Sequence, residues 1–440
     1  MPKPNVEKNI MYKLSFAIMG LYHVIHGQVM KGLLFFLLEI LVIFFMGTAG
    51  VQNLLGLNHL GTEQQGWIFD KELGIERLVQ GDNSMLLLIY GIVALITIIV
   101  FICFFISYIR SMKSLAQLVL KQQPIPNLKE DLRSLLDSRF HITLLSIPGI
   151  GVLLFTIMPL VYMISIAFTS FDHTNLPPKN LFTWVGFKNF ENILTGRMSE
   201  TFLPVLTWTI VWAVLATLTC FIFGILLAMF IQKKTIRWKK LYRSVFVLTI
   251  AVPQFVSLLI MRNLFHTSGP VNEWLLNIGL IHSPIPFLID PLLAKVFVIL
   301  INMWIGIPVY MLIATGVIMN LPEDQIEAAR IDGASVFQIF KKITMPTLIF
   351  VMTPNLIQQF IGNINNFNVI YLLTDGGPAN SNYYGAGSTD LLVTWLYKLT
   401  VEKADYNLAS VIGILTFVLS ATFSMIMYTR SKAFKSEGEF

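Results

Sequence analysis

The segment Met85–Ile109 reads MLLLIYGIVALITIIVFICFFISYI, twenty-five residues without one charged side chain. A helix of this length spans about 37 Å, because each residue adds about 1.5 Å, which exceeds the roughly 30 Å hydrocarbon core of a bilayer. Seven further apolar runs of sufficient length lie at about 32–50, 142–168, 202–231, 244–262, 292–319, 347–373 and 408–428. The sequence therefore predicts an all-α polytopic membrane protein with eight transmembrane helices.

The composition of the whole chain agrees with lipid as its solvent. Of the 440 residues, 55% are hydrophobic and 13% are charged, and the mean hydropathy is +0.70. Average soluble domains contain about 25% charged residues. The net charge of +6 is not gathered into one patch, because the basic residues lie in short segments between the apolar runs. This distribution argues against nucleic acid as a partner and indicates a membrane topology.

The distribution of lysine and arginine predicts the orientation. Of the 31 basic residues, 22 fall in the five segments that face the cytoplasm when both termini are inside; these segments are 1–31, 110–141, 232–243, 320–346 and 429–440. Cytoplasmic loops carry an excess of basic residues, so an N-in/C-in orientation is predicted. Residues 5–30 are interpreted as an amphipathic segment on the membrane surface. The apolar piece Leu14–Tyr22 is too short for a signal peptide and lacks a small-residue cleavage site.

The sequence contains no energy-converting motif of its own. The dipeptide Gly-Lys does not occur, so there is no P-loop. Glu39 is the single acidic residue well inside an apolar run, and we expect it to face other helices or to snorkel rather than to couple ions. The seven histidines are scattered, and Cys103 and Cys220 lack metal-ligand spacing. No catalytic or metal site is predicted, and the chain must obtain its energy from a partner.

The segment between the sixth and seventh runs has an unusual pattern. Residues 320–334 read NLPEDQIEAARIDGA, and residues 341–346 read KKITMP. The pattern predicts a short helix with Asn320 as its cap and Pro322 in its first turn. Gly333 allows a sharp turn into a second helical segment that ends at Lys341 and Lys342. An ordinary amphipathic loop helix is the alternative interpretation.

This segment resembles the EAA loop of ABC importer permeases, on Glu-Ala-Ala at 327–329, Asp-Gly-Ala-Ser at 332–335, Ile343 and Pro346. In that family the loop docks into a groove of a separate ATPase subunit. The resemblance implies that Glu327 is the charged contact and Gly333 the pivot. The full set of ATPase-coupling residues that it implies is Glu327, Ala328, Ala329, Asp332, Gly333 and Pro346. ATP and Mg²⁺ would bind to the ATPase, and no cofactor is expected in this chain.

Other segments resemble the carbohydrate branch of the same family. They are VGFKNF at 185–190, the stretch 243–253 that ends at a proline, SGPVN at 268–272 and LTDGGP at 373–378. Eight spans, an N-terminal extension and TDLLV at 389–393 are similar to the larger permease subunit of maltose/maltodextrin importers. The outer loop 169–201 is shorter than in members that carry a folded domain there, which puts contacts made by such a domain in doubt.

The resemblance implies a domain organisation and a set of partners. It covers residues 140–430 well and the first 140 in outline. It implies an extension over 1–140 with a surface helix and two transmembrane helices, a type I importer core of six helices over 141–430 with the EAA loop at 321–346, and a cytoplasmic tail over 431–440. The implied partners are a second permease subunit, an ATPase dimer and an extracellular solute-binding protein.

The seventh run is rich in side-chain amides. On one continuous helix, Gln359, Asn363 and Asn366 would lie within roughly 60° of one another. Amides offer donors and acceptors to sugar hydroxyls without adding charge. Polar side chains that hold helices together in lipid are the alternative. The resemblance implies that Asn363 and Asn366 contact the sugar, whereas Gln359 stands where the maltose permease has a small hydroxyl residue.

The sixth run supplies two further candidates. The segment WIGIP at 304–308 resembles the neighbouring wall of the same site in that family. Its Gly306 would let a pyranose ring approach the backbone. Tyr310 is a candidate for stacking on a sugar ring, and Trp208 and Trp212 of the fourth run are alternatives for that role. Membrane tryptophans are more often interfacial anchors.

The predicted function is therefore that of a permease subunit, not an enzyme, in an ATP-driven importer of maltose or maltodextrin at the cell membrane. Another oligosaccharide, such as a galacto-oligosaccharide, a raffinose-type sugar or a cyclodextrin, stays open as the substrate. A secondary transporter is a further alternative, although the chain lacks an ionisable relay.

Overall fold

The computed structural model describes residues 10–70, 74–233 and 235–430. The chain divides into two compact units, residues 1–186 and 187–440, which are treated separately below. The domain organisation over 1–140 and 141–430 stays a prediction, and the tail predicted over 431–440 lies outside the described residues.

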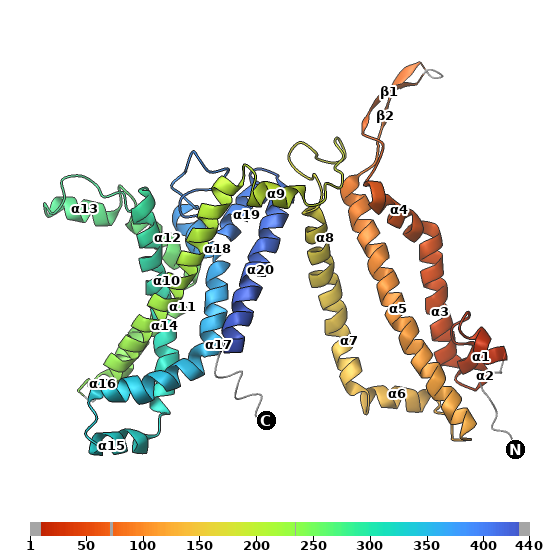
Figure 1. Cartoon of the computed structure of the whole chain (residues 1–440), viewed down its shortest axis with the longest axis horizontal. Helices are drawn as coiled ribbons and strands as arrows, with labels where there is room; N and C mark the ends of the chain where they lie inside the picture. Colours follow the sequence, from red (N-terminus) through yellow and green to blue (C-terminus); the bar gives the residue numbers. More distant parts are fainter. Residues whose placement is uncertain (1–9, 71–73, 234, 431–440) are drawn as a thin grey trace. The chain divides into compact units, whose positions relative to one another are not determined.

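The first unit is built from three long apolar helical segments, Val29–His59, Ser84–Leu120 and Phe140–Ile166 (Figure 1). Two of the three contain a π-helical turn. The elements are α1 Ile10–Leu14, α2 Leu21–Ile25, α3 Val29–Phe45, η2 Met46–Gly50, α4 Val51–His59, β1 Gly66–Asp70, β2 Ile75–Val79, α5 Ser84–Leu120, α6 Leu128–Leu136, α7 Phe140–Val152, η3 Leu153–Ile157 and α8 Met158–Ile166.

A two-stranded antiparallel hairpin joins α4 to α5. Its register runs from the pair Gly66 and Val79 to the pair Asp70 and Ile75. The sequence predicted helices only, so this hairpin was not expected. Figure 1 shows the hairpin projecting beyond the ends of α4 and α5, so it lies outside the helical bundle of this unit and leaves the all-α class of the protein unchanged.

The segment before α3 packs against α5 instead of lying as one amphipathic surface helix. Met19 and Tyr22 are buried in a cluster with Tyr108 of α5, and the Tyr108 hydroxyl donates to the Ser15 carbonyl at 2.7 Å. Glu39 faces this segment, because its Oε2 accepts the backbone N–H of Met19 at 2.8 Å; the absence of an ion-coupling role stays a prediction. Residues 5–9 of the predicted segment lie outside the described part.

The second unit contains four continuous apolar spans and one bent pair. The spans are Ser199–Gln232, Pro291–Met319, Val336–Ile364 and Tyr406–Arg430, and the bent pair is Lys239–Ala251 with Gln254–Leu264. The elements are α9 Lys188–Leu194, α10 Ser199–Gln232, α11 Lys239–Ala251, α12 Gln254–Leu264, α13 Pro270–Asn277, α14 Pro291–Met319, α15 Glu323–Ile331, α16 Val336–Ile339, η4 Phe340–Thr344, α17 Met345–Ile364, α18 Phe367–Thr374, α19 Leu392–Val401 and α20 Tyr406–Arg430.

Two of the predicted spans require correction. The fifth is broken, because α11 and α12 meet at an angle of 92°. Val252 has an extended ψ of 128° before Pro253, as expected since proline disfavours helical geometry in the residue before it. The seventh begins earlier than predicted, at Val336, and ends at Ile364, so the run 347–373 is divided between α17 and α18. Among the residues that the structure describes, seven continuous helices are long and apolar enough to span a membrane, and the bent pair makes eight if it is counted as one span.

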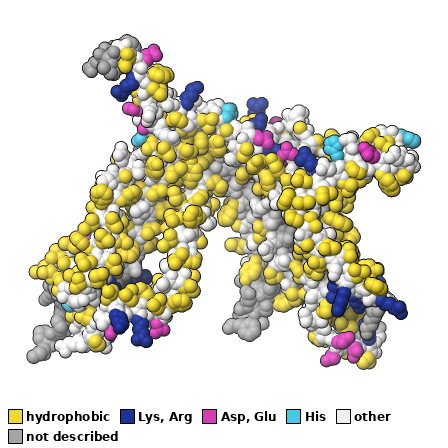
Figure 2. Space-filling model, turned by 180° about the vertical axis from the view of Figure 1, so that it is seen from behind, with side chains coloured by type: hydrophobic (Ala, Val, Ile, Leu, Met, Phe, Trp, Pro, Cys, Tyr) yellow, Lys and Arg dark blue, Asp and Glu magenta, His cyan; other side chains and the backbone are white. Residues whose placement is uncertain are grey.

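The centre of the second unit is α10, against which α14 and α17 pack. Gly224 of α10 lets α14 approach closely, because a Cβ at this position would lie 2.4 Å from Tyr310 Cβ. Figure 2 shows hydrophobic side chains over the flanks of the helices, with charged side chains gathered near their ends. This distribution matches a protein whose helix flanks face lipid.

Candidate functional site

A cavity of about 380 Å³ lies at the bend between α11 and α12. Its walls come from the bend, from the middle of α14 and from the junction of α17 with α18. The lining residues are 249–254, Ser257, Asn302, Ile305, Gly306, Val309, Tyr310, Gln359 and Asn366. Four of the five predicted sugar-site residues, Gly306, Tyr310, Gln359 and Asn366, therefore lie around one space.

Asn363 occupies a different position from the other two amides. Its side chain is fully buried, and its Nδ2 donates to Thr217 Oγ1 of α10 at 3.0 Å. Its Oδ1 accepts from Gln359 Nε2 at 3.5 Å and from Asn366 Nδ2 at 3.4 Å. Asn363 thus lies behind the two lining amides and holds them.

The prediction that the three amides share one continuous helical face is wrong. The helix α17 ends at Ile364, and Asn366 is the N-cap of α18, with its Oδ1 accepting the Val369 N–H at 3.2 Å. Asparagine favours such caps because its short side chain satisfies a free backbone N–H. The amides come together through this helix break rather than through helical spacing.

The wall from α14 has two tightly packed positions. A Cβ at Gly306 would lie 2.5 Å from Cys220 Sγ, so this glycine lets α14 approach α10 as well as lining the cavity. Tyr310 is 2% exposed, and its ring contacts Phe221 edge-on at 6.0 Å between centroids. Packing therefore accounts for both residues, and their contact with a sugar stays a prediction.

The two tryptophans of α10 donate hydrogen bonds to backbone carbonyls and do not line the cavity. Trp208 Nε1 donates to the Thr389 carbonyl at 3.1 Å. Trp212 Nε1 donates to the Asn363 carbonyl at 3.0 Å. Both rings are buried, so each buried N–H has the partner that it requires.

Polar residues that sequence reasoning missed complete the lining. Asn302 comes from the middle of α14, whereas Thr249, Gln254 and Ser257 come from the bend. Two signals were present in the sequence: an amide inside an otherwise apolar run, and a proline at 253 that interrupts the fifth run. Neither signal indicates which way a side chain points.

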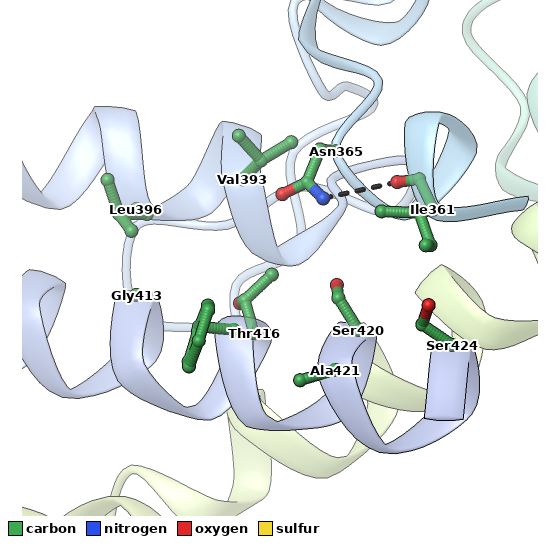
Figure 3. Close-up of a pocket in the computed structure, with 10 residues that line it drawn as sticks. Ile361, Asn365, Val393, Leu396, Gly413, Thr416, Ser420, Ala421 and Ser424 are labelled. Atoms are coloured by element: carbon green, nitrogen blue, oxygen red, sulfur yellow. Dashed lines mark hydrogen bonds between the residues drawn. The ribbon is translucent and has the colours of Figure 1, made fainter. Parts of the chain in front are cut away.

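A second cavity of about 410 Å³ lies among α17, α19 and α20 (Figure 3). Asn365 lines it, but its Nδ2 donates back to the Ile361 carbonyl at 3.1 Å, as Figure 3 shows. The Thr416 hydroxyl likewise donates within its own helix, to the Ile412 carbonyl at 2.7 Å. This cavity therefore offers a sugar fewer free polar groups than the cavity at the α11–α12 bend.

The predicted coupling loop forms α15, a turn and α16. Gly333 has φ +79°, a left-handed conformation that glycine adopts without strain, and Ser335 then caps α16. Contrary to the prediction, Asn320 does not cap α15, because its Nδ2 donates to the Gly316 carbonyl at the end of α14. The second helical segment also does not end at Lys341 and Lys342, because it continues through η4 into α17.

The predicted coupling residues divide between an exposed helix and a small hollow. Glu327 and Ala328 are exposed on α15. Ala329, Asp332 and Gly333 line a cavity of about 230 Å³ next to α16. Pro346, by contrast, lies in the first turn of α17.

Large apolar side chains are exposed around this turn. Ile331 is 86% exposed, Val336 82% and Phe337 69%. Exposed apolar side chains grouped in this way are typical of a surface that contacts another protein or a membrane.

Comparison with known proteins identifies the family. A family model described as "Binding-protein-dependent transport system inner membrane component" matches residues 220–433. The chain is 34% identical over 427 residues to the galactooligosaccharides transport system permease protein GanP of Bacillus subtilis, covering 96% of this chain and 98% of that protein. The chain belongs to the carbohydrate ABC importer permeases.

Other members match over the same length. The maltodextrin transport system permease protein MdxF of Bacillus subtilis is 34% identical over 434 residues, 96% of each chain. MalC of Streptococcus pneumoniae, also a maltodextrin transport system permease protein, is 32% identical over 446 residues, 98% of this chain and 99% of that protein. The family relationship therefore includes the N-terminal unit.

A solved structure shares the fold. A bacterial ABC transporter involved in the import of the acidic polysaccharide alginate matches with a TM-score of 0.55 and 22% identity, covering 68% of this chain and 96% of that chain. The carbohydrate ABC importer permeases are transport subunits and not enzymes, and they act with another permease, an ATPase and a solute-binding protein. This chain is accordingly a multi-pass protein of the cell membrane.

Proposed function

We propose that this permease moves maltose or maltodextrin through the 380 Å³ cavity at the α11–α12 bend. The observation that supports this best is the cavity lining, which combines amides and hydroxyls from three helical segments and contains no charged residue. Uncharged donors and acceptors suit a neutral sugar, whose hydroxyls need both. The volume also lies within the range of about 300–1,000 Å³ that is common for ligand pockets.

Within this site, Gln359 and Asn366 contact the sugar directly, together with the backbone at Gly306. Asn363 positions these two amides from behind. Tyr310 contributes its hydroxyl, which has no hydrogen-bond partner among the described residues. A buried hydroxyl without a partner is unfavourable, so a sugar hydroxyl would satisfy it after a small movement of the α14 wall.

The energy comes from ATP and Mg²⁺ bound to a partner ATPase dimer, and the loop 321–346 transmits it. Glu327 offers a charge to the ATPase, while the exposed side chains of Ile331, Val336 and Phe337 supply the apolar contact. The loop faces the cytoplasm in the N-in/C-in orientation, which the excess of basic residues in the inner segments favours.

A galacto-oligosaccharide is the second candidate substrate. It is favoured by one specific observation, the 34% identity to a permease named for galactooligosaccharides, equal to the identity to the maltodextrin permease MdxF. Both sugars are neutral and would accept the same amide contacts. A secondary transporter is no longer an alternative, because the chain belongs to the ABC permeases.

Uptake by the reconstituted importer tests the proposal. The chain would be co-expressed with the second permease, ATPase and solute-binding protein encoded by its own organism and placed in vesicles. We expect labelled maltotetraose to enter in an ATP-dependent way, and a galactotetraose to compete weakly. Faster uptake of the galactotetraose would establish the second candidate, whereas uptake of neither sugar would contradict the proposed site.

A further inference from the structure

The N-terminal unit contains a polar pocket that sugar transport does not use. Its volume is about 330 Å³, and it lies among the start of α3, the C-terminal half of α5, α6 and the start of α7. In Figure 1, α6 runs between the lower end of α7 and the lower part of α5. The pocket is therefore at the end of the apolar helices, where a lipid headgroup would be found.

Three cations and one carboxylate line this pocket: Lys31, Arg110, Arg139 and Asp131. Lys31 Nζ pairs with Asp131 Oδ2 at 3.2 Å. Within the described part of the chain, neither arginine has a side-chain hydrogen bond or an ion pair. Two guanidinium groups are thus available to an anion, and their fork of N–H donors suits the oxygens of a phosphate.

Hydroxyl groups on one face of α5 add further donors. Ser107, Ser111 and Ser114 are spaced four and three residues apart, so they lie on the same side of the helix and all line the pocket. Ser111 Oγ is 3.1 Å from His23 Nε2. Ser107 and Ser114 make no side-chain hydrogen bond among the residues that the structure describes.

Gln28 indicates that the ligand also offers a hydroxyl. The side chain lines the pocket and is 7% exposed. Its Nε2 donates to the Pro126 carbonyl at 3.0 Å, which orients the amide, but its Oε1 is buried without a partner. A buried acceptor of this kind needs a donor, and a phosphate diester without hydroxyls cannot supply one.

The rest of the wall is apolar and leads along α7. Leu115, Leu118 and Ile142 line the pocket beside the polar groups. Ile142 is 54% exposed, and Leu145, about one turn further along α7, is 64% exposed. Acyl chains can therefore extend from the pocket along an apolar helix surface, which a small soluble phosphate ester would not use.

We propose that this pocket binds the headgroup of an anionic phospholipid of the phosphatidylglycerol class. The phosphate lies between Arg110 and Arg139, and a glycerol hydroxyl donates to Gln28 Oε1. A phosphodiester with a free hydroxyl is present both in the lipid and in its deacylated headgroup, so either molecule could supply the group that the pocket recognises. The inference does not depend on which sugar the permease carries.

Lipid titration of the purified full-length chain tests this site. Its thermal unfolding midpoint would be followed in neutral detergent with phosphatidylglycerol, phosphatidylcholine or soluble glycerophosphoglycerol. We expect phosphatidylglycerol alone to stabilise the chain. Because each basic contact to an anionic lipid contributes about 1 kcal/mol, the double variant R110Q/R139Q should bind this lipid roughly thirtyfold more weakly. The control K113Q/R133Q removes the same charge from α5 and α6 outside the pocket lining and should bind like the wild type.

A second variant tests the hydroxyl contact. Gln28→Leu should lose the preference for phosphatidylglycerol over phosphatidic acid, which lacks the second glycerol. Equal affinities of R110Q/R139Q and K113Q/R133Q would overturn the site. If glycerophosphoglycerol stabilised the chain as much as phosphatidylglycerol does, the lipid would be excluded as the source of the bound headgroup. If R110Q/R139Q does not fold, the wild-type preference for phosphatidylglycerol over phosphatidylcholine decides the matter, and no preference would refute the proposal.

Discussion

Asn363 Nδ2 donates a 3.0 Å hydrogen bond to Thr217 Oγ1, joining the amide-rich end of α17 to the middle of α10. The backbone carbonyl of Asn363 also accepts a hydrogen bond from Trp212 Nε1 of α10 at 3.0 Å. These two bonds hold Asn363 from one side, while its Oδ1 faces Gln359 and Asn366 on the other. The amides that line the cavity are thus positioned by contacts outside it.

Thr217→Val should weaken this arrangement. Valine keeps the shape of threonine but leaves Asn363 Nδ2 buried without an acceptor, which costs about 1–3 kcal/mol. We expect a lower thermal unfolding midpoint and slower sugar uptake in the reconstituted importer. Thr219→Val is the matched control, because the Thr219 hydroxyl donates to the Leu215 carbonyl of its own helix and makes no bond to Asn363. Equal loss in both variants would show that the bond to Asn363 has no special role.

Gln359→Leu should weaken sugar binding without harming assembly. Each hydrogen bond lost to a sugar hydroxyl contributes about 1 kcal/mol, so the sugar concentration for half-maximal uptake should rise about fivefold. Gln358→Leu is the control, since Gln358 is exposed and does not line the cavity. Basal ATP hydrolysis and co-purification with the ATPase should stay normal in both variants. A normal half-maximal concentration in Gln359→Leu would favour a purely structural role for this amide.

Gly333→Val should uncouple ATP hydrolysis from transport. The φ of +79° at this position strains a β-branched residue by more than about 1 kcal/mol, which would misdirect α15. Sugar-stimulated ATP hydrolysis and uptake should both fall while membrane insertion persists. Gly333→Asn should retain more activity, because asparagine tolerates the left-handed region. Wild-type coupling in Gly333→Val would contradict the role of this turn.

Glu327→Lys tests the contact with the ATPase. Reversal of an exposed charge should repel a basic partner and reduce co-purification of the ATPase. Glu323→Lys makes the same change of charge one turn earlier on α15 and serves as the control. If Glu323→Lys impairs binding equally, the effect belongs to the net charge of the loop and not to a contact at Glu327.

Lys398→Met should destabilise the loop that contains Asp390 in a pH-dependent way. Lys398 Nζ lies 2.8 Å from Asp390 Oδ2, and the Asp390 side chain is fully buried. Loss of the lysine therefore leaves a buried carboxylate without its cation, at a cost of about 3–5 kcal/mol.

Burial already raises the pKa of Asp390, although Lys398 opposes this. A carboxyl with a raised pKa favours the folded state at low pH and loses this contribution as pH rises through the folded-state pKa. The loss of thermal stability in Lys398→Met should therefore be larger at neutral pH than in mild acid, and Asp390→Asn in the same chain should reduce it. A loss independent of pH would contradict this account.

Cysteine labelling tests the N-in/C-in orientation. In a variant without Cys103 and Cys220, a cysteine at Lys240 should react with a membrane-impermeant maleimide only after permeabilisation. A cysteine at Leu280, which is 70% exposed, should react in intact cells. The opposite pattern would reverse the predicted topology.

The number of spans and the turn at Gly333 could be predicted because both depend on local sequence. A long apolar run in lipid has to satisfy its backbone polar groups within one helix. The glycine provides the left-handed residue that the turn after α15 requires. The family resemblance rested on the same short motifs, and the comparisons confirm it.

The sequence by itself determined which segments are long and apolar enough to enter the membrane, where the proposed coupling loop lies and that amides gather near residue 360. Tertiary structure alone decided which amides reach the cavity. Asn363 is turned away from it by Thr217, 146 residues distant, while Asn302 of α14 and Gln254 of α12 complete its wall. The reason is physical: backbone hydrogen bonds and hydropathy act over a few residues, whereas the direction of a buried polar side chain depends on which distant helix supplies its partner.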